Sequence, residues 1–236
     1  MRLGLRMVPR RERGVEFMDD PAANEALACR SLADISTSNR LFGGTNAVVA
    51  ELAPLLADAR RAGRALTLLD VGTGAGDIPE RARAVARGAG VQLTTVGLEI
   101  TASLARAARQ RSSEAIAGDA RELPFCSRSV DIVTCSQLLH HFDDAGAAAI
   151  LAEMQRVARV RVIVADIRRA WFAAGGVWLA SWALGFHPVS RHDGVVSVLR
   201  GFRLAELAHA VRHATGRAAT VRNRPGFRVT ASWSPA

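Results

Sequence analysis

Short apolar segments alternate with amphipathic ones through the middle of the chain. Such runs are typical of parallel strands that are buried on both faces of a sheet. The predicted strands are 66–71, 92–98, a short one that ends near Ala117, 131–135 and 160–165. The predicted helices between them are 78–87, 102–111 and 145–156. Strands that alternate with helices predict an α/β fold whose parallel sheet has right-handed crossovers.

The N-terminal part precedes this alternation. A loose arm (1–20) is followed by two predicted helices, 21–36 and 46–62, and the segment NRLFGG at 39–44 separates them. We therefore divide the chain into an N-terminal arm with its helices (1–63) and an α/β domain (64–236).

An apolar insertion at about 170–200 interrupts the pattern after Asp166. The 21 residues from 170 to 190 contain no Asp, Glu, Arg or Lys, a length that approaches a bilayer span. They also contain three glycines, a proline and a histidine. A buried helix across the open end of the sheet is favoured over an apolar lid above a hydrophobic substrate, and both are favoured over a membrane span. A helix at 204–214 and short strands at 219–223 and 227–232 complete the chain.

A glycine-rich turn follows the first predicted strand. The segment 66–77 reads LTLLDVGTGAGD, so that Asp70 precedes three alternating glycines and Asp77 follows them. Glycines allow a sharp turn and a close approach of the backbone to a ligand. Such a turn before a helix is the nucleotide-binding end of a doubly wound sheet. The spacing differs from the dinucleotide fingerprint G-x-G-x-x-G, and carboxylates on both sides would repel a pyrophosphate and suit a cationic ligand.

This turn resembles motif I of the class I S-adenosylmethionine (SAM) methyltransferases, whose ligand carries an ammonium and a sulfonium group. Further elements follow in the order of that family: Glu99-Ile100 after the second strand, Gly118-Asp119-Ala120 after the third, and TCSQLLHHF at 134–142 after the fourth. The resemblance implies a Rossmann-like, doubly wound sheet of seven strands. Most of these strands would be parallel, with an antiparallel hairpin at the C-terminus and a helical lid at the N-terminus.

The resemblance also implies roles for residues. The backbone of the turn would lie against the methionine part of SAM, Glu99 would bind both ribose hydroxyls, and Asp119 would accept from the adenine amino group. MDDP at 18–21, NRLFGG at 39–44 and RHDG at 191–194 resemble a narrower bacterial subgroup of polyketide and quinone pathways, which places Arg40 on a lid near the cofactor. The expected cofactor-binding residues are Arg40, Asp70, Gly72, Thr73, Gly74, Gly76, Asp77, Glu99, Ile100, Asp119, Ala120 and Ser136.

Simpler interpretations stay open for single elements. Glu99 could cap the next helix, Asp119 could be a solvated loop residue, and 39–44 could be an ordinary turn between helices. The candidates for a general base are histidines, because imidazole titrates near neutral pH. We favour a substrate-side cluster of His192 with Asp193 and Arg191; His187, His140 and His141 are further candidates, and the last two could equally be structural.

Composition limits the remaining classes. The net charge is +9 with 31 Lys+Arg residues, all of them arginine, which raises the question of nucleic acid. The arginines are scattered and lack aromatic interleaving, so nucleic-acid binding is not favoured. Cys29, Cys126 and Cys135 are widely spaced, which predicts a reduced cytoplasmic protein without a disulfide framework or a metal site. The first fifteen residues lack the apolar core of a signal peptide.

The predicted function is SAM-dependent O-methylation of a hydrophobic small molecule of phenolic or polyketide type, as in bacterial secondary metabolism. The alternatives are a C-methyltransferase of a quinone precursor, an RNA or protein methyltransferase, and a non-catalytic SAM-binding partner subunit. The segment CSQL at 135–138 argues against the amino-directed nucleic-acid enzymes, which carry a D/N-P-P-Y/F run there. Association with a membrane surface stays open, and the sequence indicates no oligomeric state.

Overall fold

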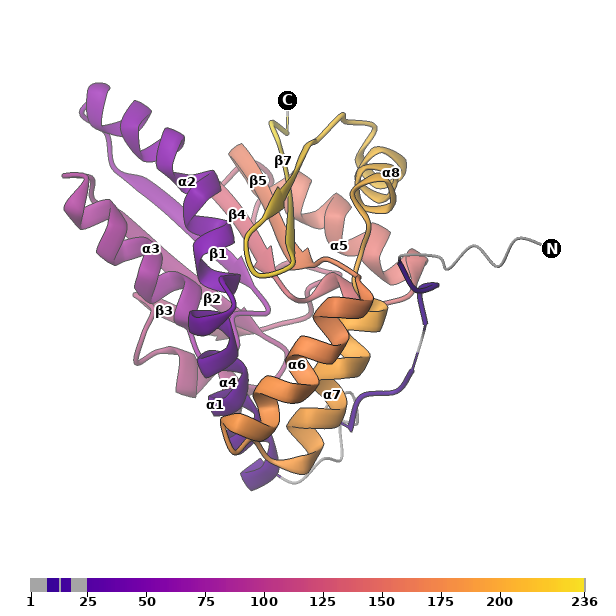
Figure 1. Ribbon diagram of the computed structural model, residues 1–236. Helices are drawn as coiled ribbons and strands as arrows, with labels where there is room; N and C mark the ends of the chain where they lie inside the picture. Colours follow the sequence, from indigo (N-terminus) through magenta and orange to yellow (C-terminus); the bar gives the residue numbers. More distant parts are fainter. Residues whose placement is uncertain (1–7, 13, 18–24, 236) are drawn as a thin grey trace.

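The computed structural model describes residues 8–12, 14–17 and 25–235. Within these residues seven strands form one sheet in the order β3-β2-β1-β4-β5-β7-β6 (Figure 1). The strands are β1 (Leu66–Val71), β2 (Leu93–Glu99), β3 (Glu114–Ala117), β4 (Val130–Ser136), β5 (Ala158–Ile167), β6 (Thr220–Arg224) and β7 (Arg228–Trp233). The first five are parallel, and β7 is antiparallel to both β5 and β6. The predicted Rossmann-like sheet with its C-terminal hairpin is confirmed.

Helices cover both faces of this sheet. They are α1 (Glu25–Leu41), α2 (Gly44–Arg61), α3 (Asp77–Gly88), α4 (Ala102–Ala108), α5 (Asp144–Val157), α6 (Trp171–Ala183), α7 (Pro188–Arg200) and α8 (Leu204–Thr215). One core cluster joins α2 and α3 to the sheet through residues such as Val48, Leu52 and Leu68. The other joins α5 and α8 to the opposite face, with Leu69 and Ile150 among its members. Leu68 and Leu69 are adjacent in β1, and successive side chains of a strand point to opposite faces of the sheet. The strand β1 therefore contributes to both core clusters, as expected for a strand that helices cover on both faces.

Two predictions about the N-terminal part are wrong. The helix α1 extends to Leu41, so Asn39 and Arg40 lie in its last turn and only a short link around Gly43 (φ 76°) separates it from α2. The arm is also not loose where it is described: Arg11 Nε donates to the carbonyl of Arg200 (2.9 Å), and Glu16 is buried against α7. The MDDP segment lies outside the described residues.

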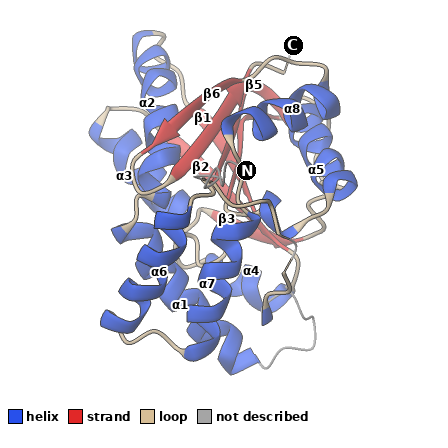
Figure 2. Ribbon diagram, turned by 45° about the vertical axis from the view of Figure 1, so that its right-hand side comes forward, coloured by secondary structure: helices blue, strands red, loops and turns tan. Residues whose placement is uncertain are grey.

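The helices α1, α6 and α7 gather at one end of the sheet (Figure 2). The prediction of a buried helix for 170–190 is wrong. The helix α6 packs on α7 through Ala173, Ala174 and Val177, but its other side is exposed, with Phe172 at 80% and Leu179 at 66% accessible. None of the helices in the described part of the chain has the length and hydrophobicity that crossing a bilayer requires.

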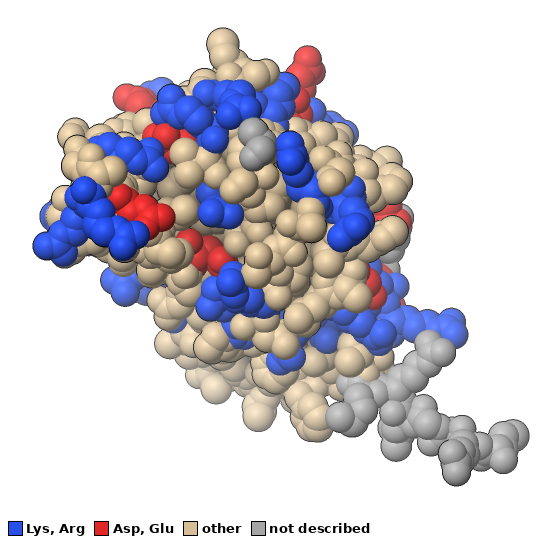
Figure 3. All heavy atoms as spheres, turned by 90° about the horizontal axis from the view of Figure 1, so that it is seen from above, with Lys and Arg blue, Asp and Glu red and all other residues tan. Residues whose placement is uncertain are grey.

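Figure 3 shows one face of the molecule, on which basic side chains outnumber acidic ones and lie in several groups separated by uncharged surface. Whether this chain binds nucleic acid stays a prediction from its sequence.

A buried carboxylate ties α2 to the C-terminal hairpin. Glu51 Oε1 accepts hydrogen bonds from Arg224 Nη2 (2.5 Å) and Thr230 Oγ1 (2.6 Å), and Glu51 Oε2 accepts from Ser232 Oγ (3.0 Å). Burial raises the pKa of Glu51, but the hydrogen bonds from Thr230, Arg224 and Ser232 outweigh it and hold the pKa below its ordinary value.

Replacing Glu51 by glutamine will lower the free energy of unfolding by about 3 kcal/mol, because breaking a buried ion pair leaves its partners uncompensated. Because the pKa of Glu51 is lower in the folded protein than in the unfolded chain, ionised Glu51 stabilises the fold at pH values above its unfolded-state pKa. This stabilisation is lost as the pH falls through the folded-state pKa, where the carboxylate becomes protonated. The wild-type advantage in urea denaturation should therefore shrink in acid. The control is Asp58→Asn on the same helix, whose exposed pair with Arg61 is worth less than about 1 kcal/mol. Equal urea midpoints for both variants would contradict the prediction.

Candidate functional site

The glycine turn (residues 72–76) lies at the topological switch point of the sheet, where the connection from β1 runs to one side of the sheet and later strands are added on the other side. It follows β1, whose neighbours are β2 and β4, and ligands of doubly wound sheets bind at this point. Gly72, Gly74 and Gly76 all have positive φ (68°, 55° and 80°), a conformation that suits glycine. A Cβ on Gly72 would lie 2.8 Å from the side chain of Leu138, which follows β4. The sequence therefore needs glycine here for both backbone conformation and space.

Asp70 lies under this turn as a buried carboxyl group. Its Oδ1 accepts a hydrogen bond from Thr134 Oγ1 of β4 (2.8 Å). Its Oδ2 is buried and has no partner among the described residues, and the same holds for Ser136 Oγ at the end of β4. Burial raises the pKa of Asp70 to about 7 despite the hydrogen bond from Thr134 and the nearby hydroxyl of Thr73, and the charges of Glu99 and Asp77 add to the rise. Asp70 Oδ2 near the end of β1 and Ser136 Oγ at the end of β4 are therefore available to accept hydrogen bonds from a ligand.

Glu99 connects the end of β2 to the glycine turn. Its Oε1 accepts from the amide of Gly74 (2.5 Å) and its Oε2 from that of Ile100 (3.2 Å). The carboxyl group is buried, and burial raises its pKa against these two hydrogen bonds. The helix-cap interpretation of Glu99 is wrong, because Thr101 caps α4 by accepting from the amide of Leu104 (3.3 Å). A carboxylate in this position can accept from two neighbouring hydroxyl groups at once.

The other predicted cofactor residues surround this centre at different distances from it. Asp119 is beside Glu99, because the amide of Gly118 donates to the Glu99 carbonyl (2.8 Å). Its carboxylate pairs with Arg121 (2.7 Å), and hydrogen bonds from that residue hold the pKa of Asp119 below its ordinary value. Asp77 accepts from Ser36 Oγ (2.8 Å) and Arg111 Nη1 (2.6 Å).

Asp77 thus ties α1 to α3, and it shares a hollow between α1, α2 and α3 with Arg40. Ile100 is 63% exposed, whereas Thr73 and Ala120 are buried. The structure gathers Asp70, Glu99 and Ser136 at the turn. The cofactor roles of all the predicted residues stay predictions.

A cavity of about 140 Å³ lies on the other side of the segment that follows β4. Gln137 of that segment and Asp34 of α1 border it, and Val177, Phe186 and Val198 give it an apolar wall. Gln137 also donates to Asn39 of α1 through a short hydrogen bond. Leu138 contacts the position of Gly72 and its neighbour Gln137 borders the cavity, so this short segment connects the turn to the cavity.

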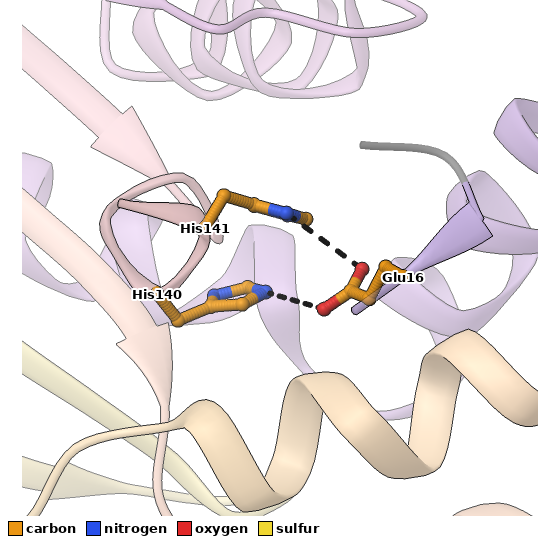
Figure 4. A group of neighbouring side chains, drawn as sticks. All are labelled: Glu16, His140 and His141. Carbon is orange, nitrogen blue, oxygen red and sulfur yellow. Dashed lines mark ion pairs between the residues drawn. The ribbon is translucent and has the colours of Figure 1, made fainter. Parts of the chain in front are cut away.

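Three ionisable side chains meet at one wall of the cavity (Figure 4). His140 and His141 come from a 3₁₀ turn, η2 (Leu139–His141), and Glu16 comes from the N-terminal segment. The distance from His140 Nε2 to Glu16 Oε1 is 3.9 Å, and that from His141 Nδ1 to Glu16 Oε2 is 3.7 Å. Behind them, His140 Nδ1 is 2.7 Å from Asp166 Oδ1. Burial raises the pKa of Asp166, but the charge and hydrogen bond of His140 outweigh it and lower the pKa.

The favoured cluster around His192 lies mostly outside this cavity. The His192 side chain is 49% exposed, and its Nδ1 is 3.0 Å from Asp193 Oδ1. Asp193 borders the cavity and accepts from the amide of Phe17 (3.0 Å), while the guanidinium of Arg191 lies 3.8 Å from the ring centroid of Trp182. His187 caps α7 by accepting from the amide of Val189 (3.3 Å). A catalytic role for His192 stays a prediction, and the geometry favours His140 and His141.

Glu16 and Asp166 were not among the site residues predicted from the sequence. Asp166 could have been found, because it lies near the carboxyl end of a predicted strand, at the edge where ligands of such sheets bind. Glu16 carried no signal, since only the folded chain brings it to two histidines more than 120 residues away.

Comparisons with known proteins support the cofactor side of the site. The sequence model of a family described as "Methyltransferase domain" matches residues 68–161. The chain is 38% identical to a demethylmenaquinone methyltransferase of Roseiflexus sp. (strain RS-1), over 43% of this chain and 42% of that relative. This match thus spans less than half of the relative's length.

Solved structures show the same fold at low identity. A magnesium protoporphyrin IX methyltransferase from Synechocystis PCC 6803 with bound SAH superposes with a TM-score of 0.56 and 15% identity, over 93% of this chain and 91% of that one. A SAM-dependent methyltransferase from Aquifex aeolicus gives 0.53 and 14%, over 72% and 82%. The matched family segment includes Asp70, Glu99 and both histidines of η2, whereas Glu16, α6 and α7 lie outside it.

Proposed function

Because this chain carries a class I methyltransferase domain, we propose that it transfers the methyl group of SAM to an oxygen of a hydrophobic small molecule. One observation carries this proposal. A cavity with an apolar wall borders the segment that contacts the glycine turn through Leu138, and three of its ionisable groups, Glu16, His140 and His141, lie together. A donor at the turn and an acceptor in the cavity would be neighbours, and proximity of this kind is the main requirement of methyl transfer.

The residues at the turn fit SAM. The unpartnered oxygens of Asp70 and Ser136 can accept from polar N–H groups or interact with the positive charge of the methionine part. Glu99 lies where it can hold two ribose hydroxyls, as strand-end acids do in Rossmann-type sites. Bound SAM supplies a methyl group that its sulfonium already activates. The chain then has to orient the acceptor, exclude water and manage one proton.

In the proposed transfer, the acceptor oxygen forms the new bond to the methyl carbon. The carbon–sulfur bond breaks, its electron pair stays on sulfur, and the hydroxyl proton leaves the acceptor. Glu16, His140 and His141 face the place where this proton is lost. Asp166 holds the His140 ring through Nδ1, so that Nε2 faces the cavity and Glu16. Val177, Phe186 and Val198 would hold the apolar body of the acceptor.

C-methylation of a quinone precursor is the second candidate. The 38% identity to a demethylmenaquinone methyltransferase over 43% of this chain favours it. Incubation with isotopically labelled SAM and matched phenolic and quinol acceptors separates the two candidates. An O-methyl product supports the proposal, and a ring C-methyl product supports the alternative, since NMR distinguishes the two carbons. Tight SAM binding without any labelled product would indicate a non-catalytic SAM-binding protein.

The exposed side of α6 suggests how a hydrophobic acceptor arrives. Phe172, Trp178, Leu179 and Trp182 are more than half exposed, and no Asp or Glu occurs from 167 to 192. Aromatic side chains next to arginines are typical of helices that lie on membrane surfaces. The chain has a net charge of +9. A second copy of the chain packed on α6 would therefore be repelled electrostatically, whereas an anionic lipid surface would be attracted. We propose that this side of α6 docks on an anionic membrane, beside the cavity that Val177 borders.

A triple change of Phe172, Trp178 and Leu179 to serine will reduce binding to anionic phosphatidylglycerol vesicles at least about tenfold, because each buried apolar side chain contributes about 1.5–3 kcal/mol. Vesicle co-sedimentation measures the effect. Serine changes at Val15 and Phe227, which are exposed on other elements, are the matched control. Absence of vesicle binding by the wild type, or equal binding by both variants, would contradict the membrane proposal.

A further inference from the structure

Glu16, His140 and His141 each place one ligand atom within 4.8 Å of the others, at the wall of the cavity (Figure 4). We propose that this cluster binds a divalent first-row metal ion. Two imidazole nitrogens and one carboxylate oxygen form a ligand set that Zn²⁺ and its neighbours accept, with a position left open for a further ligand. The inference deepens the proposed function, on which it rests, by naming what holds the acceptor oxygen.

An unpartnered buried nitrogen points into the cluster. The His140 side chain is only 2% exposed, and in the described structure its Nε2 has no hydrogen-bond partner. A buried polar atom without a partner costs about 1–3 kcal/mol. Nε2 faces a carboxylate oxygen at 3.9 Å, too far for a hydrogen bond. A cation at this point would give Nε2 the partner that it lacks.

Two of the three proposed ligands, His140 and Glu16, are oriented by hydrogen bonds to other residues, as metal ligands usually are. His140 Nδ1 lies 2.7 Å from Asp166 Oδ1, which itself accepts from the amide of Ile167 (2.7 Å). A proton on Nδ1 leaves the lone pair of Nε2 directed at the cluster, as in carboxylate–histidine–metal arrangements. Glu16 Oε1 is held by Ser197 Oγ (2.9 Å) and Arg200 Nη1 (3.0 Å). Each of these two ligands is thus oriented by a second residue.

The ligand atoms lie farther apart than bound ligands would. The two carboxylate–histidine distances are 3.7 and 3.9 Å, one to each carboxylate oxygen, and the three ligand atoms of the set lie within 4.8 Å of one another. Tetrahedral ligands at about 2.0–2.1 Å from zinc lie roughly 3.3 Å apart. Rotation of the His141 and Glu16 side chains would have to close this difference.

The local charge also favours a cation. Among the described residues that border the cavity, Glu16, Asp34 and Asp193 are acidic and Arg228 is the basic side chain apart from the histidines. This acidic excess occurs on a chain whose net charge is +9. Arg200 opposes a cation, but it binds Glu16 at Oε1, whereas Oε2 faces His141.

A metal with an open position would lower the pKa of an acceptor hydroxyl that binds there. With the metal bound, His140 and His141 act as its ligands and not as bases, so the proton leaves to water. The oxygen forms the bond to the methyl carbon, and the electron pair of the broken carbon–sulfur bond stays on sulfur. The oxidation state of the metal does not change, so the step needs no further reactant.

The test uses untagged, full-length protein that has been stripped with a chelator and then titrated with Zn²⁺ in a calorimeter. Co²⁺ absorption spectroscopy is a second readout that does not depend on activity. We expect one ion per chain, with affinity at least about 100-fold lower in Glu16→Gln and His141→Ala and about 10–100-fold lower in Asp166→Asn. His192→Ala, which changes a half-exposed histidine outside the cavity, should bind like the wild type.

Glu16→Gln keeps an oxygen for Ser197 and Arg200, so thermal melts can show that the variant remains folded. Substoichiometric binding by the wild type, or binding that depends on His192 and not on Glu16 and His141, would overturn the metal proposal. A stripped protein that binds no metal but transfers methyl groups at the full rate would also overturn it, and would leave the proposed function standing. Failure of the protein to bind SAM would overturn the proposed function whatever the metal result.

Discussion

Replacing Glu99 by alanine will weaken SAM binding about 100-fold. The carboxylate is buried at the end of β2 and holds the amide of Gly74 at 2.5 Å. The variant removes the acceptor for two ribose hydroxyls. Hydrogen bonds to a charged group contribute about 1.5–3 kcal/mol each, and a loss of about 3 kcal/mol corresponds to roughly 100-fold in the dissociation constant. Isothermal titration calorimetry measures this constant directly.

The control for this variant is Glu114→Ala. Glu114 is also a glutamate on the parallel part of the sheet, but it is exposed at the start of β3, so its loss should leave SAM binding unchanged. Thermal melts show whether each variant is folded. Equal SAM affinity in a folded Glu99→Ala protein and the wild type would remove Glu99 from the cofactor site.

Replacing His140 by asparagine will lower kcat about 100- to 10,000-fold, the range that positioned proton transfer contributes to enzymes. The variant removes the Nε2 that takes the proton in the metal-free protein and that holds the ion when the proposed metal is bound. Asparagine retains an N–H near the position of Nδ1 for the buried Asp166 and removes the Nε2 that faces Glu16. This variant therefore avoids leaving Asp166 without a partner, which would destabilise the fold. SAM affinity should stay within about twofold, because the ring belongs to the wall of the cavity.

Steady-state rates with labelled SAM measure this effect. His209→Ala, at an exposed position of α8, is the control and should turn over like the wild type. Full activity of a folded His140→Asn protein would show that the cavity wall takes no part in the transfer. A loss of activity in His192→Ala as large as in His140→Asn would instead support the cluster that sequence analysis favoured.

The sheet could be predicted from the sequence because its strands are buried on both faces. Residues such as 66–71 then form a mostly apolar run, and this signal is local. The glycine turn and Glu99 were also recognisable, since their spacing to the strand ends is fixed by the fold. The burial of 170–190 was predicted wrongly because apolar composition does not show whether a partner covers the second side of a helix. In the structure α7 covers one side of α6 only.

The cavity wall could not be predicted in full. His140 and His141 were visible as a pair, but nothing in their neighbourhood in the sequence indicates Glu16, which approaches from a segment near the N-terminus. The histidine that looked most reactive beside an acid, His192, turned out to be 49% exposed. Contacts between segments far apart in the sequence determine which ionisable groups are desolvated, and desolvation determines which of them can act on a proton.

The central claim is that a methyl group passes from the glycine turn to an acceptor in the Glu16–His140–His141 cavity. The most direct measurement follows the labelled methyl group of SAM onto a panel of hydrophobic phenols, with wild type and His140→Asn compared at equal SAM saturation. We predict label on the oxygen of at least one phenol with the wild type, and at least about a 100-fold slower transfer with His140→Asn. Equal transfer rates for the two proteins, or saturated SAM binding with no label on any acceptor, would contradict the account.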